Sequence, residues 1–101
     1  MNAAERAARF AALHEGGCFA LPNAWDAGSA RVMAHAGAVA IATTSAGIAW
    51  QLGRRDYAVS LAESLENARV LIAATDMPVS ADLEDGFGPS PEDCARTVQA
   101  A

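Results

Sequence analysis

Short apolar runs alternate with helical segments along this chain, and this alternation restricts the possible folds more than any other feature. Residues 38–42 read Ala-Val-Ala-Ile-Ala and are apolar at every position, as in strands buried on both faces of a parallel sheet. The apolar run at 18–21 and the alternating segment at 79–83 predict two further strands. Because helical segments separate all three, the sequence predicts an α/β fold with a parallel sheet.

Four helices and one long connection complete this pattern. A capping box, Ser60-Leu-Ala-Glu63, begins the third helix, and Ser90 followed by Pro91 begins the fourth. A connection as long as 43–59 is more often functional than idle, because loops in α/β units usually run about 2 to 6 residues. The first two helices are predicted at residues 2–14 and 26–36, each stopped by glycine.

Polar clusters follow each predicted strand, and their position separates two α/β architectures. The clusters lie at residues 22–26, 43–56 and 82–88. An open doubly wound sheet usually carries a G-x-G-x-x-G or Walker loop, and neither occurs here. A (β/α)8 TIM barrel places its chemistry after the strands, and a complete barrel takes about 250 residues. We therefore expect residues 1–101 to form the N-terminal part of a single α/β-barrel domain, with an N-terminal helix and about three β/α units.

Three carboxylates occur within four residues where the third predicted strand ends, at Asp82, Glu84 and Asp85, and Gly86 follows them. Strand alternation would place Asp82 and Glu84 on the same face as Ser80. Mg²⁺ is bound by oxygen ligands and usually takes one or two carboxylates together with waters and substrate oxygens. The pattern predicts a metal site, and the alternative interpretation is a solvated acidic turn.

The loop after the second strand offers hydroxyl and backbone N–H groups at Thr43, Thr44 and Ser45. Such donors suit a small anionic substrate, and the alternative is that these side chains bond only the local backbone. Asp56, further along the same loop, reads on its own as a surface or capping residue. Trp25 and Trp50 are interpreted as packing residues.

Composition argues against several classes of function. The net charge is −5, lysine is absent, and the seven arginines are scattered. Without a basic patch, nucleic-acid binding is not expected. Cys18 and Cys94 have no metal-binding spacing, and no apolar stretch approaches the roughly 18 residues of a membrane span. We therefore expect a cytoplasmic protein that binds neither nucleic acid nor membrane.

Three segments, in this order and spacing, resemble the isocitrate lyase/phosphoenolpyruvate mutase superfamily. They read Leu-Pro-Asn-Ala-Trp-Asp at 21–26, Thr-Thr-Ser-Ala-Gly at 43–47 with Leu-Gly-Arg-Arg-Asp at 52–56, and Asp-Leu-Glu-Asp-Gly-Phe-Gly at 82–88. The resemblance implies a (β/α)8 barrel, a homotetramer for the full-length form, and dependence on Mg²⁺ (or Mn²⁺). It also implies cleavage or formation of C–C or P–C bonds in small carboxylic acids.

The same resemblance implies roles for individual residues. The metal motif D-x-D-x-G-[YF]-G of the superfamily falls on Asp82 and Glu84, and Glu84 departs from it by being one methylene longer than aspartate. A loop aspartate with a catalytic role falls on Asp56. A further metal-associated glutamate lies on strand four of the superfamily fold, and the mobile catalytic loop follows that strand; both are expected past Ala101. The substrate-binding loop falls on Thr43, Thr44, Ser45 and Ala46.

The implied activity is Mg²⁺-dependent cleavage of a C–C bond in a small 2-hydroxy or 2-oxo carboxylic acid through an enolate, as in 2-methylisocitrate lyase. One alternative is P–C bond chemistry, as in phosphoenolpyruvate and carboxyphosphonoenolpyruvate phosphonomutases. Another is an inactive truncated fragment, or a half-domain that completes a barrel with a second chain. We expect the 101 residues alone to be inactive, because three strands leave two open sheet edges and the catalytic loop is absent.

Overall fold

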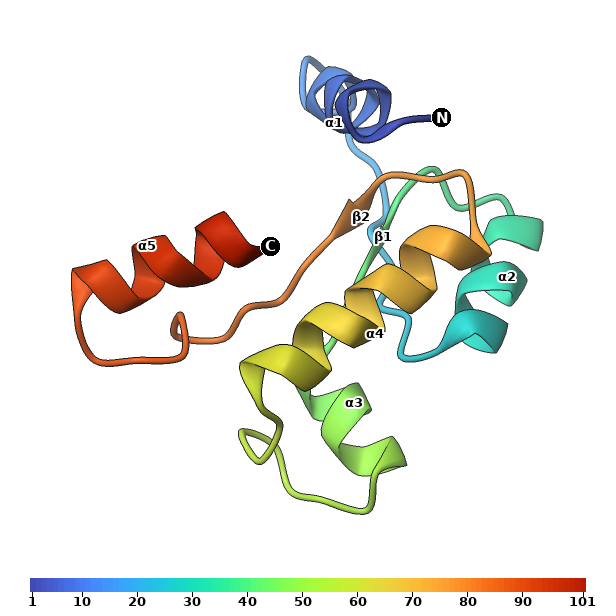
Figure 1. The fold of residues 1–101 in the computed structure, drawn as a ribbon. Helices are drawn as coiled ribbons and strands as arrows, with labels where there is room; N and C mark the ends of the chain where they lie inside the picture. The colour runs from blue at the N-terminus through green and yellow to red at the C-terminus, as the bar shows by residue number, and fades with distance from the viewer.

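The computed structural model describes residues 1–101 and consists of five α-helices and two short β-strands (Figure 1). Helices alternate with parallel strands, which is the α/β arrangement that the sequence predicts. None of the helices combines the length and the apolar character needed to cross a membrane. In chain order the elements are α1 (Ala3–Ala12), α2 (Ala27–His35), β1 (Ile41–Ala42), α3 (Ser45–Gln51), α4 (Leu61–Ala74), β2 (Val79–Ser80) and α5 (Pro91–Ala100).

Three chain segments run parallel at the centre of the molecule. β1 pairs with β2, and a single bridge joins Asn23 to Ala42 on the opposite edge of β1. The Ala24 N–H donates to the Ala42 carbonyl at 2.8 Å, which places residues 22–24 beside β1. β1 is therefore the middle segment of the three. Between the two strands, the paired residues are Ile41 with Val79 and Ala42 with Ser80.

The prediction of a first strand at 18–21 is wrong. The chain joins the sheet only at Asn23, and residues 18–21 are irregular. Phe19 lies instead in an edge-to-face aromatic cluster with Phe10 and His14, at ring-centroid distances of 6.3 and 5.1 Å. An apolar run predicts that its side chains are buried. Here Phe19 is partly buried by packing against the end of α1 rather than in the sheet.

The other two strands are shorter than predicted. β2 ends early because Thr43 uses its hydroxyl, rather than a backbone carbonyl, to accept the N–H of Asp82 at 2.8 Å. Glu84 then adopts a φ of +53°, which lies in the left-handed region. The two-residue alternation of an extended strand therefore does not continue to Glu84, and alternation does not set its orientation relative to Asp82.

All four predicted helices form, and each begins after a residue whose side chain caps the first turn. The prediction that 43–59 is only a connection is wrong, because α3 occupies part of it. Thr44 caps α3 by accepting the Gly47 N–H at 3.1 Å, and a threonine in this position was the sequence signal for the missed helix. The caps of α1, α2, α4 and α5 are Asn2, Asp26, Ser60 and Ser90.

The hydrophobic core lies between the short sheet and helices α2 and α4. Ala24, Ala30, Ile41, Leu71 and Met77 form one cluster, and each is at most 7% exposed. Alanine at two of these positions leaves room for α2 to approach the strands closely. The core thus packs against the middle of the sheet, and the two ends of the strands lie outside the core.

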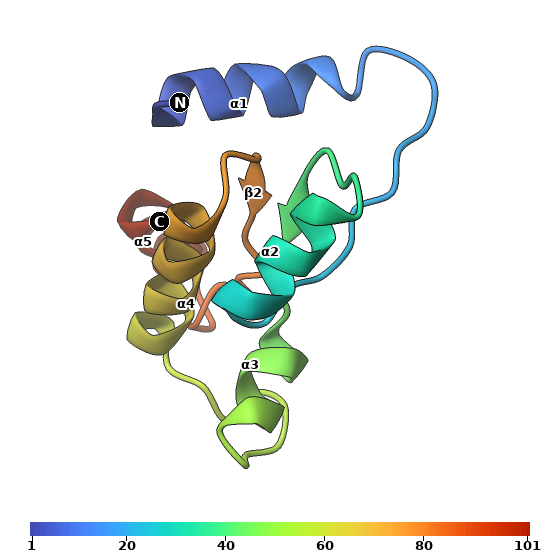
Figure 2. The ribbon, with the colours of Figure 1, turned by 90° about the vertical axis from the view of Figure 1, so that its right-hand side faces the viewer.

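The two ends of the strands carry different elements. Figure 2 shows α1 lying across the end of the molecule at which β2 begins, and α3 lying at the opposite end. Both α3 and the acidic segment after β2 follow directly on the carboxyl ends of the strands. The residues that the sequence singles out for function therefore belong to the α3 end.

Candidate metal and substrate site

The loops that follow β1 and β2 are joined by hydrogen bonds where the two strands end. The Asp82 N–H donates to Thr43 Oγ1 at 2.8 Å, and the Ser45 N–H donates to Asp82 Oδ2 at 3.0 Å. Thr43 and Ser45 are only 3% and 8% exposed, so water has little access to these contacts. The predicted substrate loop and the predicted metal motif therefore meet in space.

Asp82 is held in its ionised form by the backbone around it. Besides the bond from Ser45, its Oδ1 accepts the Glu84 N–H at 3.0 Å. Burial alone raises the pKa of Asp82, but the N–H donors of Ser45 and Glu84 outweigh burial and hold that pKa below its ordinary value of 3.8. Each carboxylate oxygen has two lone pairs, so one remains on each for a further ligand.

Glu84 shows the opposite behaviour. Burial is the largest cause that raises the pKa of Glu84 above its ordinary value of 4.5, and the charges of Asp56, Asp82 and Asp85 raise it further. Its Oε1 atom is buried and has no hydrogen-bond partner. An unpartnered carboxylate oxygen among other carboxylates is unfavourable, and a bound cation would remove both causes of the penalty.

Backbone strain is concentrated around the same loops. The three non-glycine residues with positive φ are Tyr57 at +67°, Glu84 at +53° and Phe87 at +58°. Tyr57 directly follows Asp56, whose Oδ1 accepts the Tyr57 N–H at 2.9 Å. Conformations of this kind cost on the order of 1–3 kcal/mol each and cluster at functional sites. Their location here supports a functional role for the two loops.

The oxygen donors of this site fit a hard divalent cation that is bound partly by water and substrate. The chain has no group of three or more His, Cys, Asp or Glu side chains placed to hold a metal ion. Mg²⁺ does not need such a cage, because it usually keeps several waters and takes one or two carboxylates. The free lone pairs of Asp82 and the unpartnered Oε1 of Glu84 supply that number.

The four residues of the predicted substrate loop are engaged in different ways. The hydroxyls of Thr43 and Thr44 each accept a main-chain N–H, which is the local role left open by the sequence. The Ser45 N–H is bound to Asp82, whereas the Ala46 N–H has no acceptor within the chain. The Thr44 N–H has no acceptor either, so Thr44 and Ala46 both offer free backbone donors, and substrate binding by the four residues stays a prediction.

A cavity of about 470 Å³ beside the predicted substrate loop was not predicted from the sequence. Trp25 and Trp50, which the sequence predicts as packing residues, line this cavity in the 101-residue chain and are 43% and 68% exposed. Gln51 and Asn67 fix the chain here by donating to the Trp25 carbonyl at 2.9 and 2.8 Å. A lone tryptophan carries no periodic signal, so only the fold reveals its exposure. The remaining lining residues are Asn23, Thr44, Gly47 and Gln51.

Comparison with known proteins gives a consistent assignment. The family model described as phosphoenolpyruvate phosphomutase matches residues 10–101. The uncharacterised protein Rv1998c of Mycobacterium tuberculosis (strain ATCC 25618 / H37Rv) is 37% identical over 89 residues, which are 84% of this chain and 33% of that protein.

Solved structures agree with this match. A crystal structure from Burkholderia cenocepacia J2315 is 48% identical with a TM-score of 0.93, and the match covers 95% of this chain and 35% of that one. The structure of 2,3-dimethylmalate lyase, a PEP mutase/isocitrate lyase superfamily member, is 30% identical with a TM-score of 0.80, over 98% of this chain and 35% of that one.

The chain spans about a third of the length of these relatives. The prediction of an α/β-barrel fold is confirmed, with this chain corresponding to an N-terminal helix and the first β/α units. Since the family model matches nearly the whole sequence, the chain belongs to the phosphoenolpyruvate phosphomutase family, within the PEP mutase/isocitrate lyase superfamily.

Proposed function

We propose that the complete protein is a Mg²⁺-dependent lyase that cleaves a C–C bond in a small 2-hydroxy or 2-oxo carboxylic acid through an enolate. The observation that carries this proposal is the junction between the two loops. There an ionised Asp82 is tied to the substrate loop, and a buried oxygen of Glu84 lies unpartnered beside other carboxylates. Proximity of a cation site and an anion-binding loop suits a substrate that carries both a carboxylate and a neighbouring oxygen.

Different residues of this chain would bind the cation and the substrate. Asp82 and Glu84 would hold Mg²⁺ (or Mn²⁺), and Asp56 would add negative charge on the Glu84 side. When bound, the cation supplies Lewis-acid stabilisation of negative charge on the substrate oxygens. The free N–H groups of Thr44 and Ala46 would donate to the anionic end of the substrate. The hydroxyls of Thr43 and Thr44 and the N–H of Ser45 would hold the loop in place.

Two similarities support lysis of a small carboxylic acid. One similar structure is a 2,3-dimethylmalate lyase, and another, at 30% identity and a TM-score of 0.80, is an oxaloacetate acetylhydrolase. The second candidate function is P–C bond chemistry, because the matching family model is described as phosphoenolpyruvate phosphomutase. We propose a homotetramer for the complete protein in either case.

The test compares substrates and variants of the complete protein. It should cleave a 2-hydroxy or 2-oxo acid such as 2-methylisocitrate, 2,3-dimethylmalate or oxaloacetate, and a chelator should abolish the activity. Rearrangement of phosphoenolpyruvate in the same assay would establish the second candidate instead. Turnover of neither class by the intact protein would refute both.

Substitution of the carboxylates tests their roles in the same protein. Asp82→Ala should lower kcat/KM by roughly three orders of magnitude or more, because each 1.4 kcal/mol of lost stabilisation is about tenfold. Glu84→Ala should lower kcat/KM less than Asp82→Ala does, because the longer side chain is expected to bind the cation through a water molecule. Asp85→Asn is the control, because Asp85 is exposed and its Oδ1 only accepts the Phe87 N–H. Equal losses in all three variants would identify the segment as no more than an acidic turn.

A further inference from the structure

Helix α1 is attached to the molecule in a different way from the other helices. None of its residues is buried, whereas α2, α3, α4 and α5 each contribute buried residues. It lies across the end of the molecule at which β2 begins, remote from the candidate site (Figures 1 and 2). Within the 101-residue chain, burial of apolar side chains therefore contributes little to its attachment.

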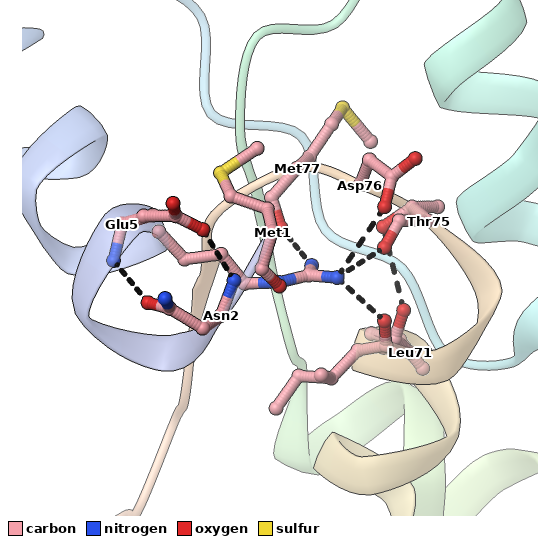
Figure 3. A network of polar contacts seen from close by, with 9 residues as sticks. Met1, Asn2, Glu5, Leu71, Thr75, Asp76 and Met77 are labelled. Atoms are coloured by element: carbon pink, nitrogen blue, oxygen red, sulfur yellow. Dashed lines mark hydrogen bonds and ion pairs between the residues drawn. The ribbon is translucent and has the colours of Figure 1, made fainter.

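One side chain of α1 makes the polar contacts with the rest of the fold. The Arg6 guanidinium donates to the carbonyls of Met77 at 2.6 Å, Thr75 at 2.8 Å and Ile72 at 3.2 Å. It also lies 3.8 Å from a carboxylate oxygen of Asp76, and the Arg6 side chain is only 15% exposed. Figure 3 shows this network converging on the turn that carries Thr75, Asp76 and Met77.

The C-terminal end of α4 explains why an arginine from elsewhere binds there. The last carbonyls of a helix lack intrahelical partners and carry partial negative charge. α4 ends at Thr75 in an extended conformation, without the left-handed glycine cap that satisfies many helices, and its last turn holds no basic residue. Arg6 therefore supplies from α1 the cation and the donors that α4 lacks.

The apolar contacts of α1 are loose by comparison. A groove of about 380 Å³ separates Ala7 and Phe10 of α1 from Ile72 and Val79 of the body. The turn after α1 is held to the helix itself, because Phe19 and Phe10 meet edge to face with centroids 6.3 Å apart. Beyond that turn, a second cavity of about 460 Å³ lies where Phe19 faces the end of α2.

We propose that residues 3–19 form a strap that Arg6 fastens to the end of α4. The strap opens as one unit about residues 20–21 while α2, the two strands and α4 stay folded. Opening uncovers the apolar groove and releases the turn at Thr75–Met77 that leads into β2. Because an isolated helix of ten residues is marginal in water, α1 loses its own hydrogen bonds once it is released.

Hydrogen exchange of backbone amides in the 101-residue chain tests the strap, with Arg6→Ala and Arg9→Ala compared with the parent. Arg9 is the matched control, because it is an exposed arginine of the same helix that makes no side-chain hydrogen bond or ion pair. In Arg6→Ala the α1 amides should exchange at least tenfold faster, and the amides of α2 and α4 should keep their rates. Arg9→Ala should leave the α1 rates within twofold of the parent.

Arg6→Lys provides a second variant that retains the charge. One ammonium group cannot reproduce the planar fork that reaches three carbonyls, so an increase in α1 exchange smaller than that of Arg6→Ala is expected. Unchanged α1 exchange in Arg6→Ala, or an equal rise in Arg9→Ala, would overturn the proposal. Loss of protection throughout α2 and α4 in both Arg6 variants would also overturn the proposal, because α1 would then unfold together with the rest of the chain rather than on its own.

Discussion

At the scale of single residues, Asp82 links two loops that the sequence holds far apart. Its backbone N–H and both of its carboxylate oxygens are bonded, to Thr43, Ser45 and Glu84. The same bonds fix the direction of the side chain and lower its pKa. A residue that would serve as a metal ligand is therefore already oriented by the fold, which reduces the ordering that binding requires.

Asp82→Asn should destabilise the 101-residue chain at pH 7, because an amide offers one acceptor oxygen where the carboxylate offers two. We expect a loss of about 1 kcal/mol in the free energy of unfolding, after allowance for solvent screening. The pKa of Asp82 is lowered in the fold, so its stabilisation is fully present above the ordinary value of 3.8. It is lost as the pH falls through the lowered pKa.

Urea unfolding of both proteins between pH 7 and pH 2 measures this difference. The two unfolding free energies should converge at the acid end of the range. Asp85→Asn, in which the exposed turn acceptor is retained, should follow the parent throughout. A constant gap between Asp82→Asn and the parent down to pH 2 would show that ionisation of Asp82 is not the cause.

At the scale of elements, the loop after β2 is coupled to α5 by close contact at Gly86. The Thr97 hydroxyl donates to the Gly86 carbonyl at 2.6 Å, and Thr97 is 2% exposed. Gly86 has a φ of +92°, and a Cβ there would lie 2.5 Å from Cys94 Sγ. Only glycine fits this position, so the acidic loop and α5 hold each other in place.

Gly86→Ala should therefore destabilise the chain by at least about 1–2 kcal/mol, from the left-handed backbone and the forced displacement of Cys94. Gly28→Ala is the control, because Gly28 lies in α2 and its added Cβ would meet only Asp26 Oδ1, at 3.6 Å. Removal of a helical glycine should stabilise by roughly 0.5–1 kcal/mol. Thermal or urea unfolding gives both values, and the prediction fails if the two substitutions shift stability in the same direction.

At the scale of the whole molecule, the chain carries the start of a barrel with much of its apolar surface uncovered. Only 14 of the 101 residues are buried, and large side chains such as Val32, Trp50 and Val98 are about 70% exposed. The relatives that it matches are about three times as long. A barrel closes its sheet edges against neighbouring strands, so most of the contacts of that fold lie outside these residues.

The 101 residues alone should therefore give no turnover of the acids proposed above, even with saturating Mg²⁺. The edges of 22–24 and β2 stay unpaired, and a site that depends on several strands is incomplete. A coupled assay with the complete protein as positive control measures this, at a sensitivity of about 10⁻⁴ of its rate. Turnover above that limit that a chelator abolishes would show that the first β/α units suffice.

The sequence by itself determined the class of fold and four of the five helices, and it indicated the segments of functional interest. Capping at Ser60 and Ser90 involves only a side chain and the three residues that follow it, so it can be predicted from the order of residues alone. The apolar run at 38–42 likewise predicts a buried strand, without any information on the segments that pack against it. The motifs at 43–46 and 82–84 were recognisable because their spacing along the chain is enough to define them.

Only the tertiary structure decided where the strands pair and which hydrogen bonds and charges surround the site residues. The strand predicted at 18–21 failed because a parallel ladder forms where a partner lies, and that partner is Ala42 facing Asn23. The end of β2 depends on a hydroxyl of Thr43, and the raised pKa of Glu84 depends first on burial and then on the charges of Asp56, Asp82 and Asp85, of which Asp56 comes from another loop. The contact of Arg6 with the end of α4 could likewise not be predicted from the sequence. The carbonyls that Arg6 binds lie more than 60 residues away along the chain and come close only in the folded structure.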